Sequence, residues 1–291
     1  MRVFIRLLQA LVVCLYSPVV LAETSLCREG ALRISAVPVK NIDELIEEYQ
    51  PLAELLSDGL GVPVQILRSS SYEGVIDAIV SGGADIALLG PASYLMAYQQ
   101  NNQLEAFASM ALEGGHFSPA GDYYQSVLVV RSDSGMRTLQ DTRGGRVALN
   151  DPASTSGALI PNREFPERAG VPLNEHFSGQ VYAGSHDKAL DALLEGRVDA
   201  AFVSAVRVDE YLRRGLITVD SLRVLWRSAP IHYDPFVFSS EVCPQLKTRV
   251  RELMLEQSPE MSAFLRSQRT TRIIPVSHQD YGRLLQLMTP R

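Results

Sequence analysis

Two stretches of the chain repeat one pattern, and this repeat limits the possible folds more than any other feature. "SYEGVIDAIVSGGADIALL" (71–89) and "SHDKALDALLEGRVDAAFV" (185–203) align without a gap. Each begins with a serine suited to cap a helix, continues with apolar residues at helical spacing, and ends in a short apolar run after a glycine. The repeat predicts two α/β lobes that are built alike. Asp85 and Asp199 precede the two strands, where we expect them to hold the turn.

The rest of the chain also alternates short β-type runs with helical patterns, which is typical of an α/β protein. Strands are expected at 31–37, 63–67, 85–89, 126–130, 146–149, 180–184, 199–203, 222–226 and 235–238. Helices are expected at about 43–60, 73–82, 92–100, 155–168, 187–195, 205–214, 244–256 and 279–288. Gly61 follows the first helix, where a helix end favours glycine.

The first 22 residues have the three-part pattern of a secretory signal peptide. Arg2 and Arg6 precede an apolar run, and a cleavage site is expected after Ala22. The alternative is an uncleaved membrane anchor, although the run is short for a span and is interrupted by a glutamine and a proline. We therefore expect the mature chain to lie in the periplasm.

The mature chain is acidic. Loss of Arg2 and Arg6 lowers the basic residues from 27 to 25 against 33 acidic residues, so the formal net charge is −8. This balance argues against a nucleic-acid partner, and an anionic ligand has to be held by local donors. Cys27 and Cys243 remain, an even number in an oxidising compartment. They form either a disulfide or two separate thiols, because a sequence does not give the distance between them.

Several predicted helix starts carry polar side chains that can face one crevice. Open α/β sheets bind ligands beyond the carboxyl ends of their strands, where helices begin. A helix start offers free N–H groups and about half a positive charge, and hydroxyl groups add further donors. Each side chain can equally serve only as a helix cap, but three consecutive hydroxyls exceed what one cap requires. The candidates for an anion site are Tyr72, Tyr94, Ser154, Thr155, Ser156 and His186.

The hydroxyl-rich segment "NDPASTSGALIP" (150–161) does not match the enzyme motifs that it superficially suggests. It has neither the lysine nor the glycine spacing of a nucleotide-hydrolase phosphate loop. A serine hydrolase with His186 and Asp187 or Asp234 can be drawn on paper, but the G-x-S-x-G turn is missing. No cysteine and histidine pair has metal-site spacing. We expect no catalytic residue, no metal and no cofactor.

Long segments resemble the periplasmic phosphonate-, phosphite- and phosphate-binding components of ABC importers. They are "LRISAVPV", "YEGVIDAIVSGGADIALLGPASYLMA", "YYQSVLVVRSDSGMRTLQDTRGGRVALNDPASTSG", "AGSHDKALDALLEGRVDAAFVS", "VLWRSAPIHYDPFVFSS" and "VSHQDYGRLLQL". The likeness covers nearly the whole mature chain, and the segments with "DPASTSG" and "GSHDKAL" are the most specific.

The resemblance implies a type II, two-lobed venus-flytrap fold with a ligand cleft between two similar α/β lobes. Lobe one would comprise 28–122 plus 231–291 and lobe two 125–228, with hinge crossings near 122–126 and 227–232. It implies that the six helix-start candidates hold the oxyanion of a ligand. Family members that bind aminoalkylphosphonates place two carboxylates at the ammonium group.

Asp234 matches one of those carboxylates, but the segment around Val206 supplies no second acid, so amine recognition is in doubt. His232 is unusual in its position, and its length is enough for us to expect it near the cleft. Asp234 can instead accept a hydrogen bond from a ligand that still carries a proton, which would reject sulfate. The alternative role for Asp234 is to brace the hinge.

The expected function is capture of a small phosphorus oxyanion, namely phosphonate, phosphite or phosphate, and its delivery to an ABC permease in the inner membrane. The chain is expected to act as a monomer, without nucleic acid. A sensory protein of the same fold, reporting its ligand to a membrane kinase, is the alternative, and a serine hydrolase is a further one.

Overall fold

The computed structural model describes residues 30–256 and 258–289. The predicted signal peptide (1–22) and Cys27 lie outside these residues. Cys243 is in a disulfide, but its predicted pairing with Cys27 stays a prediction. Within the described part of the chain, no helix is both long and apolar enough to span a membrane.

Thirteen strands and ten α-helices alternate along the described residues. The strands are β1 (Leu32–Ala36), β2 (Val64–Ile66), β3 (Ile86–Leu88), β4 (Glu105–Leu112), β5 (Tyr123–Tyr124), β6 (Ser126–Arg131), β7 (Arg146–Leu149), β8 (Gly179–Tyr182), β9 (Ala200–Ser204), β10 (Leu222–Arg227), β11 (Ile231–His232), β12 (Phe236–Phe238) and β13 (Thr270–Pro275). The helices are α1 (Ile42–Leu60), α2 (Tyr72–Val80), α3 (Pro91–Gln100), α4 (Ile160–Ala169), α5 (Leu173–His176), α6 (His186–Leu194), α7 (Ala205–Arg213), α8 (Pro244–Leu255), α9 (Met261–Ser267) and α10 (Gly282–Met288).

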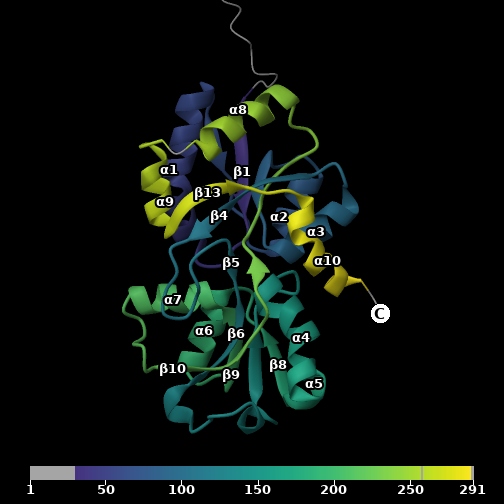
Figure 1. Cartoon of the computed structure of the whole chain (residues 1–291), viewed down its shortest axis with the longest axis vertical. Coiled ribbons are helices and arrows are strands. Elements are labelled where there is room, and N and C mark those ends of the chain that lie inside the picture. Colours follow the sequence, from purple (N-terminus) through teal and green to yellow (C-terminus); the bar gives the residue numbers. More distant parts are fainter. Residues whose placement is uncertain (1–29, 257, 290–291) are drawn as a thin grey trace, which may run out of the picture.

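The strands form two large sheets, one in each half of the molecule (Figure 1). One sheet has six strands in the order β13-β4-β12-β3-β1-β2, and the other has five in the order β10-β6-β9-β7-β8. The chain passes between the halves in β5 and β11, which pair antiparallel with each other. The first sheet therefore takes its strands from both ends of the described chain, and the second takes them from the middle.

The repeated segments have the same structure in both halves. Ser71 caps α2 by accepting the Gly74 N–H at 3.1 Å, and Ser185 caps α6 by accepting the Lys188 N–H at 3.2 Å. Each helix is followed by a strand, β3 or β9, that pairs parallel with a central neighbour. The prediction of two lobes built alike is confirmed, because both have the same serine cap and the same parallel strand pairing.

The aspartates before these strands also have the same role. Asp85 Oδ2 accepts the N–H of Arg33 at 2.7 Å, and Asp199 Oδ2 accepts the N–H of Arg146 at 2.7 Å. In each case the donor belongs to the neighbouring parallel strand, β1 or β7. The two carboxylates thus join the turn to the sheet, as expected for structural residues.

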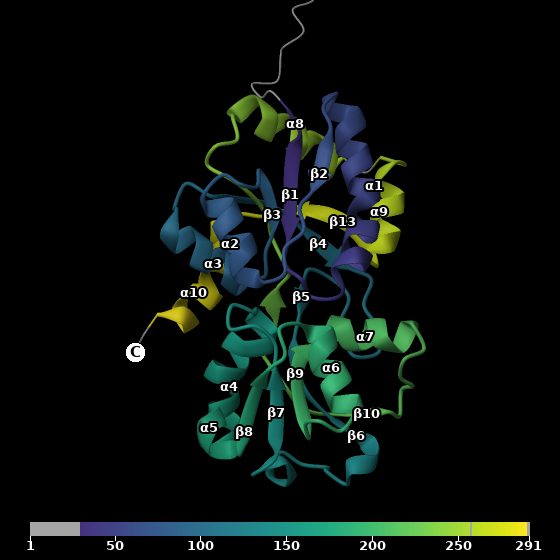
Figure 2. The same cartoon turned by 180° about the vertical axis from the view of Figure 1, so that it is seen from behind.

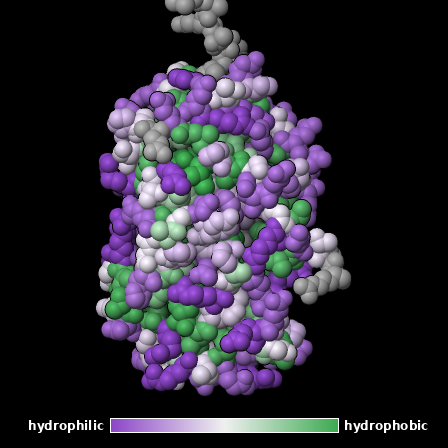
Figure 3. Space-filling view, viewed as in Figure 1, coloured by the Kyte–Doolittle hydropathy of each residue, from purple (hydrophilic) through white to green (hydrophobic). Residues whose placement is uncertain are grey.

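Apolar helix faces close the core of each lobe. In α1 the buried residues recur at helical spacing, and they pack with β1, β4 and β12. The buried residues of α1 are Leu45, Tyr49, Leu52, Ala53, Leu56 and Leu60. Gly61 ends this helix at φ 69° and donates its N–H to Ser57 O, as predicted. The outer surface is mostly hydrophilic on the face drawn in Figure 3, with apolar side chains in separate patches.

Candidate functional site

A cavity of about 300 Å³ lies between the two sheets. Its wall includes residues that come within about five positions after β1, β3 and β4 of the first sheet and after β7, β8 and β9 of the second. Figure 2 shows β1 and β7 above and below the junction between the halves. The cavity is therefore where the carboxyl ends of strands from both lobes meet, as expected for ligand sites in open α/β sheets.

The hydroxyl-rich segment forms one edge of this cavity. Ser154, Thr155 and Ser156 all line it, and each is at most 2% exposed. Ser154 Oγ caps the following helix by accepting the Gly157 N–H at 3.2 Å, and Leu159 N–H reaches back to Ser154 O in one wide π-helical turn. The first N–H groups of this helix have no acceptor inside the helix, so they and the hydroxyls are available to an anion.

His186 supplies a neutral donor to the same cavity. Its Nδ1 accepts the backbone N–H of Ser204 at 3.1 Å and also contacts Asn150 Nδ2. Burial, and next the charge of Arg207, lower the pKa of His186 to about 3. Since Nδ1 is an acceptor, the ring proton sits on Nε2, which is left to donate.

Tyrosine hydroxyls add to this set of donors. Tyr72 and Tyr124 line the cavity and are buried. Burial first, and then the Asp234 charge, raise the pKa of both hydroxyls far above their ordinary value. Nearby Ser156 and Thr155 act on the pKa of Tyr124 in the opposite direction. Both tyrosines therefore keep their protons at any pH at which the protein works.

Asp234 is an acid that lines the same cavity as these donors. Burial raises the pKa of its carboxyl to about 7. Its backbone carbonyl accepts the Ser109 hydroxyl at 3.0 Å, whereas its carboxylate has neither an ion-pair nor a hydrogen-bond partner among the described residues. An unpaired acid beside hydroxyl donors can accept a proton-bearing ligand group.

Tyr94 lies apart from the other candidates. It is fully buried in α3, does not line the cavity, and hydrogen-bonds to His278 Nδ1 at 2.9 Å through its hydroxyl. Its ring packs edge-on against Tyr281. We correct the predicted role accordingly: Tyr94 braces α3 against the C-terminal segment. His232 does not line the cavity either, and its ring packs against Tyr123 and Tyr281.

The structure adds cations that were not predicted from the sequence, and two of them, Lys40 and Arg207, come from opposite lobes. Arg207, in the first turn of α7, and Lys40, between β1 and α1, both line the cavity. Asp187 holds the Arg207 guanidinium in a two-pronged pair, with N–O distances of 2.9–3.0 Å. Both cations follow the carboxyl end of a strand, so the rule that identified the other residues could have found them.

Direct contacts join the lobes around the cavity. Thr155 Oγ1 accepts the Ala92 N–H at 2.9 Å, and the Ser93 hydroxyl donates to Ala153 O at 2.8 Å. On another side, Asp209 of α7 accepts the N–H groups of Phe117 and Ser118 at 2.8 Å. The molecule is thus in a closed arrangement.

Within 30–256 and 258–289, no group of histidine, cysteine or acidic residues is arranged to hold a metal ion. The uncharged donors that face the cavity are hydroxyl, imidazole and backbone N–H groups, which suit an oxyanion.

Comparisons with known proteins agree with this geometry. The family described as ABC transporter, phosphonate, periplasmic substrate-binding protein matches residues 34–281. The phosphate-import protein PhnD of Mycolicibacterium smegmatis is 26% identical over 268 residues, which are 86% of this chain and 82% of the relative. The phosphonates-binding periplasmic protein of Escherichia coli is 27% identical over 244 residues, 82% and 70% of the two chains.

A solved structure supports the fold independently. PhnD1 from Prochlorococcus marinus, in complex with methylphosphonate, matches with a TM-score of 0.79 at 19% identity, over 88% of this chain and 96% of that chain. The predicted two-lobed binding-protein fold is confirmed. Because the family match spans most of its length, this chain belongs to the periplasmic substrate-binding proteins of phosphonate ABC transporters.

Proposed function

We propose that this chain captures a small phosphorus oxyanion, namely a phosphonate, phosphite or phosphate, in the cavity between its lobes and delivers it to an ABC permease. The observation that carries the proposal is the convergence of uncharged donors from both lobes on one cavity. These donors are the hydroxyls of Ser154, Thr155, Ser156, Tyr72 and Tyr124 and the imidazole of His186.

Each donor has a role that follows from its position. The segment from Ser154 to Ser156 opens a helix, so its free N–H groups and the helix dipole favour negative charge. His186 Nε2–H and the Tyr72 hydroxyl, at the first turns of α6 and α2, would hold the other oxygens. Such charge-assisted hydrogen bonds contribute about 1.5–3 kcal/mol each.

We infer that Asp234 selects ligands that bring a proton. Its carboxylate is partly buried and unpaired among the described residues, so a bare oxyanion beside it is repelled, while hydrogen phosphate or a monoprotonated phosphonate can donate to it. Sulfate carries no proton near neutral pH. The site would therefore prefer phosphorus oxyanions over sulfate.

The lobes would close over the ligand by rotation about the crossings near 122–126 and 227–232. We take lobe one as 28–122 plus 231–291 and lobe two as 125–228, in line with the strands that each sheet contains. The protein would act as a periplasmic monomer after signal removal, and the permease in the inner membrane would recognise the closed form.

Binding without turnover is part of the proposal. A serine nucleophile needs a base with a free lone pair directed at it. The Nδ1 lone pair of His186 is occupied by the Ser204 N–H, and its low pKa makes the ring a poor proton acceptor. The geometry supports a neutral hydrogen-bond donor rather than a catalytic base.

Isothermal titration calorimetry and thermal-shift assays on the mature protein, freed of bound ligand, test this function. Phosphate, phosphite and methylphosphonate form the panel, with sulfate and taurine as controls. A ligand at 100 times its Kd adds about 2.7 kcal/mol of stability. Ser156→Ala should weaken binding roughly tenfold or more through one lost hydrogen bond to a charged group. Ser178→Ala, an exposed hydroxyl of the same lobe, should not. If no phosphorus oxyanion shifts the melting curve, the proposal is wrong.

A further inference from the structure

The cavity is larger than a bare phosphorus oxyanion needs. Its volume is about 300 Å³, which at about 30 Å³ for each water in the liquid is room for about ten waters. The wall beyond the hydroxyl donors contains apolar side chains, among them Val39, Met110 and Val206, and basic side chains that include Lys40 and Arg207. The ligand therefore has space for an organic substituent with a polar end.

Arg207 is held so that part of its guanidinium remains available. Its Nε and Nη2 atoms donate to Asp187, while Nη1 has no hydrogen-bond partner among the described residues. The residue is only 9% exposed, and it lines the cavity. A buried, oriented guanidinium with two free N–H groups is a receptor for an oxygen acceptor, because guanidinium groups only donate.

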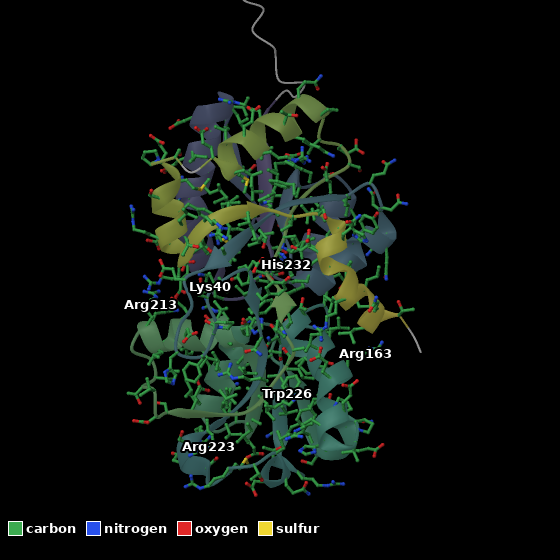
Figure 4. All side chains as sticks on the ribbon, viewed as in Figure 1. Lys40, Arg163, Arg213, Arg223, Trp226 and His232 are labelled. Atoms are coloured by element: carbon green, nitrogen blue, oxygen red, sulfur yellow. The ribbon has the colours of Figure 1, made fainter. Side chains whose placement is uncertain are left out.

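Lys40 reaches the same region from the other lobe. In Figure 4 it lies at the level of the junction between the lobes, just above α7. Its ammonium pairs with Glu48, which leaves donor capacity on a group with three N–H bonds. Burial first, and then the charge of Arg207, lower the pKa of Lys40, so the two cations repel each other across the cleft.

The acidic groups around these cations are already engaged. Glu48 pairs with Lys40, Asp187 with Arg207, and Glu210 with Arg213. Asp234 has no such pair among the described residues, and its charge raises the pKa values of the cavity tyrosines. An anionic group between the two cations would relieve their repulsion and use their free donors, whereas an ammonium group there would add a third positive charge.

We propose that the substrate is an organophosphonate whose organic substituent ends in a carboxylate, held between Lys40 of one lobe and Arg207 of the other. This inference rests on the proposed function of the same site, because the phosphonate end occupies the hydroxyl donors. A carboxylate that contacts both lobes also stabilises the closed form, so it contributes to closure as well as to selectivity.

Calorimetry with matched ligands tests the inference. The panel is 3-phosphonopropionate, propylphosphonate as the equally long ligand without a carboxylate, 2-aminoethylphosphonate and methylphosphonate. We expect 3-phosphonopropionate to bind at least tenfold more tightly than propylphosphonate, and 2-aminoethylphosphonate to bind more weakly than either. Equal or weaker binding of 3-phosphonopropionate, while methylphosphonate still binds, overturns this inference alone. If no phosphonate binds, the proposed function fails with it.

Variants of Lys40 and Arg207 test whether these two residues hold the ligand carboxylate. Lys40→Met should reduce the advantage of 3-phosphonopropionate over propylphosphonate to less than threefold. Removal of Arg207 alone would leave Asp187 buried and unpaired, so the double change Asp187→Asn with Arg207→Gln is the matched second variant. Arg163→Gln, an exposed arginine on α4 (Figure 4), is the control that should keep the full advantage. If both site variants fold, as judged by circular dichroism, and keep the advantage, the carboxylate is not held here.

Discussion

The raised pKa of Asp234 predicts how selectivity between phosphate and sulfate depends on pH. Burial raises the pKa of this carboxyl to about 7, so it is mostly protonated below pH 7 and ionised above. Hydrogen phosphate can donate its own proton to the ionised carboxylate. Sulfate cannot, and it can bind closely only if Asp234 takes up a proton from solution.

The size of the effect follows from the proton uptake. Each pH unit above 7 makes protonation of Asp234 less favourable by about 1.4 kcal/mol, a factor of ten. Sulfate affinity should therefore fall about tenfold per pH unit above 7, or roughly thirtyfold at pH 8.5, and should change little below pH 7. Phosphate affinity should stay nearly constant above pH 7, so the ratio of the two affinities grows.

Other groups of the site contribute little over this range. Burial and the Arg207 charge hold the pKa of His186 at about 3, so the ring stays neutral from pH 5.5 to 8.5. Burial and the Asp234 charge raise the pKa of Tyr72, which stays protonated. Lys40 is another cavity residue with a shifted pKa, which burial lowers.

Competition calorimetry with phosphate and sulfate at pH 5.5, 6.5, 7.5 and 8.5 measures the ratio. Between pH 7.5 and 8.5, where phosphate is mostly hydrogen phosphate, the ratio in Asp234→Asn should change little, because the amide does not titrate. Asp220→Asn, an exposed acid of lobe two, should behave like the unchanged protein. A ratio that is independent of pH in the unchanged protein, or equally steep in Asp234→Asn, would refute the reasoning.

Three further substitutions have definite expected outcomes. Gly157→Ala should destabilise the protein by about 1–3 kcal/mol in urea unfolding, because its Cβ would lie 1.8 Å from Asn150 Nδ2; an unchanged unfolding midpoint would contradict this. Asp209→Ala removes the acceptor for the Phe117 and Ser118 N–H groups, so it should speed ligand release at least tenfold in stopped-flow fluorescence, with Asp220→Ala as the control. Thr155→Val removes the acceptor for the Ala92 N–H, so it should weaken phosphate binding in calorimetry roughly tenfold, more than loss of a surface hydroxyl such as Ser178→Ala.

The sequence predicts most of the fold because the elements that form the core follow simple periodicities. Strand β4 was not predicted because it lacks those signals. β4 reads "EAFASMAL", which contains no β-branched residue and does not alternate, although seven of its eight residues are buried. Its burial on both faces comes from its place between β12 and β13, a tertiary fact that no local pattern encodes.

Strand β13 was not predicted for a different reason. It ends at Pro275, and a proline lowers the expectation of a strand. β13 is the edge of its sheet, where a residue without an N–H group is tolerated. The sequence does not reveal which strand lies at an edge, because that depends on the order in which distant segments pair.

The ion pair of Arg207 with Asp187 is a contact that no local sequence pattern predicts. Asp187 and Arg207 lie on different helices, 20 positions apart, and only the packing of α6 beside α7 makes them a pair. The family resemblance directs attention to an acid near Val206, whereas the structure has a cation, Arg207, at the adjacent position. The net charge at the cavity therefore depends on which charged side chains the fold brings together as ion pairs.

The position of Tyr94 outside the cavity refines the rule by which helix starts predict residues of a ligand site. Tyr72 and His186 are the first residues of α2 and α6, and both line the cavity. In α3 the first residue is Pro91, and Tyr94 comes three positions later, about 4.5 Å further along the axis. The start of α3 does meet the other lobe, but through the Ala92 N–H that binds Thr155. Side chains at the first position of a helix, together with the backbone N–H groups beside them, are therefore the ones to assign to a cleft of this kind.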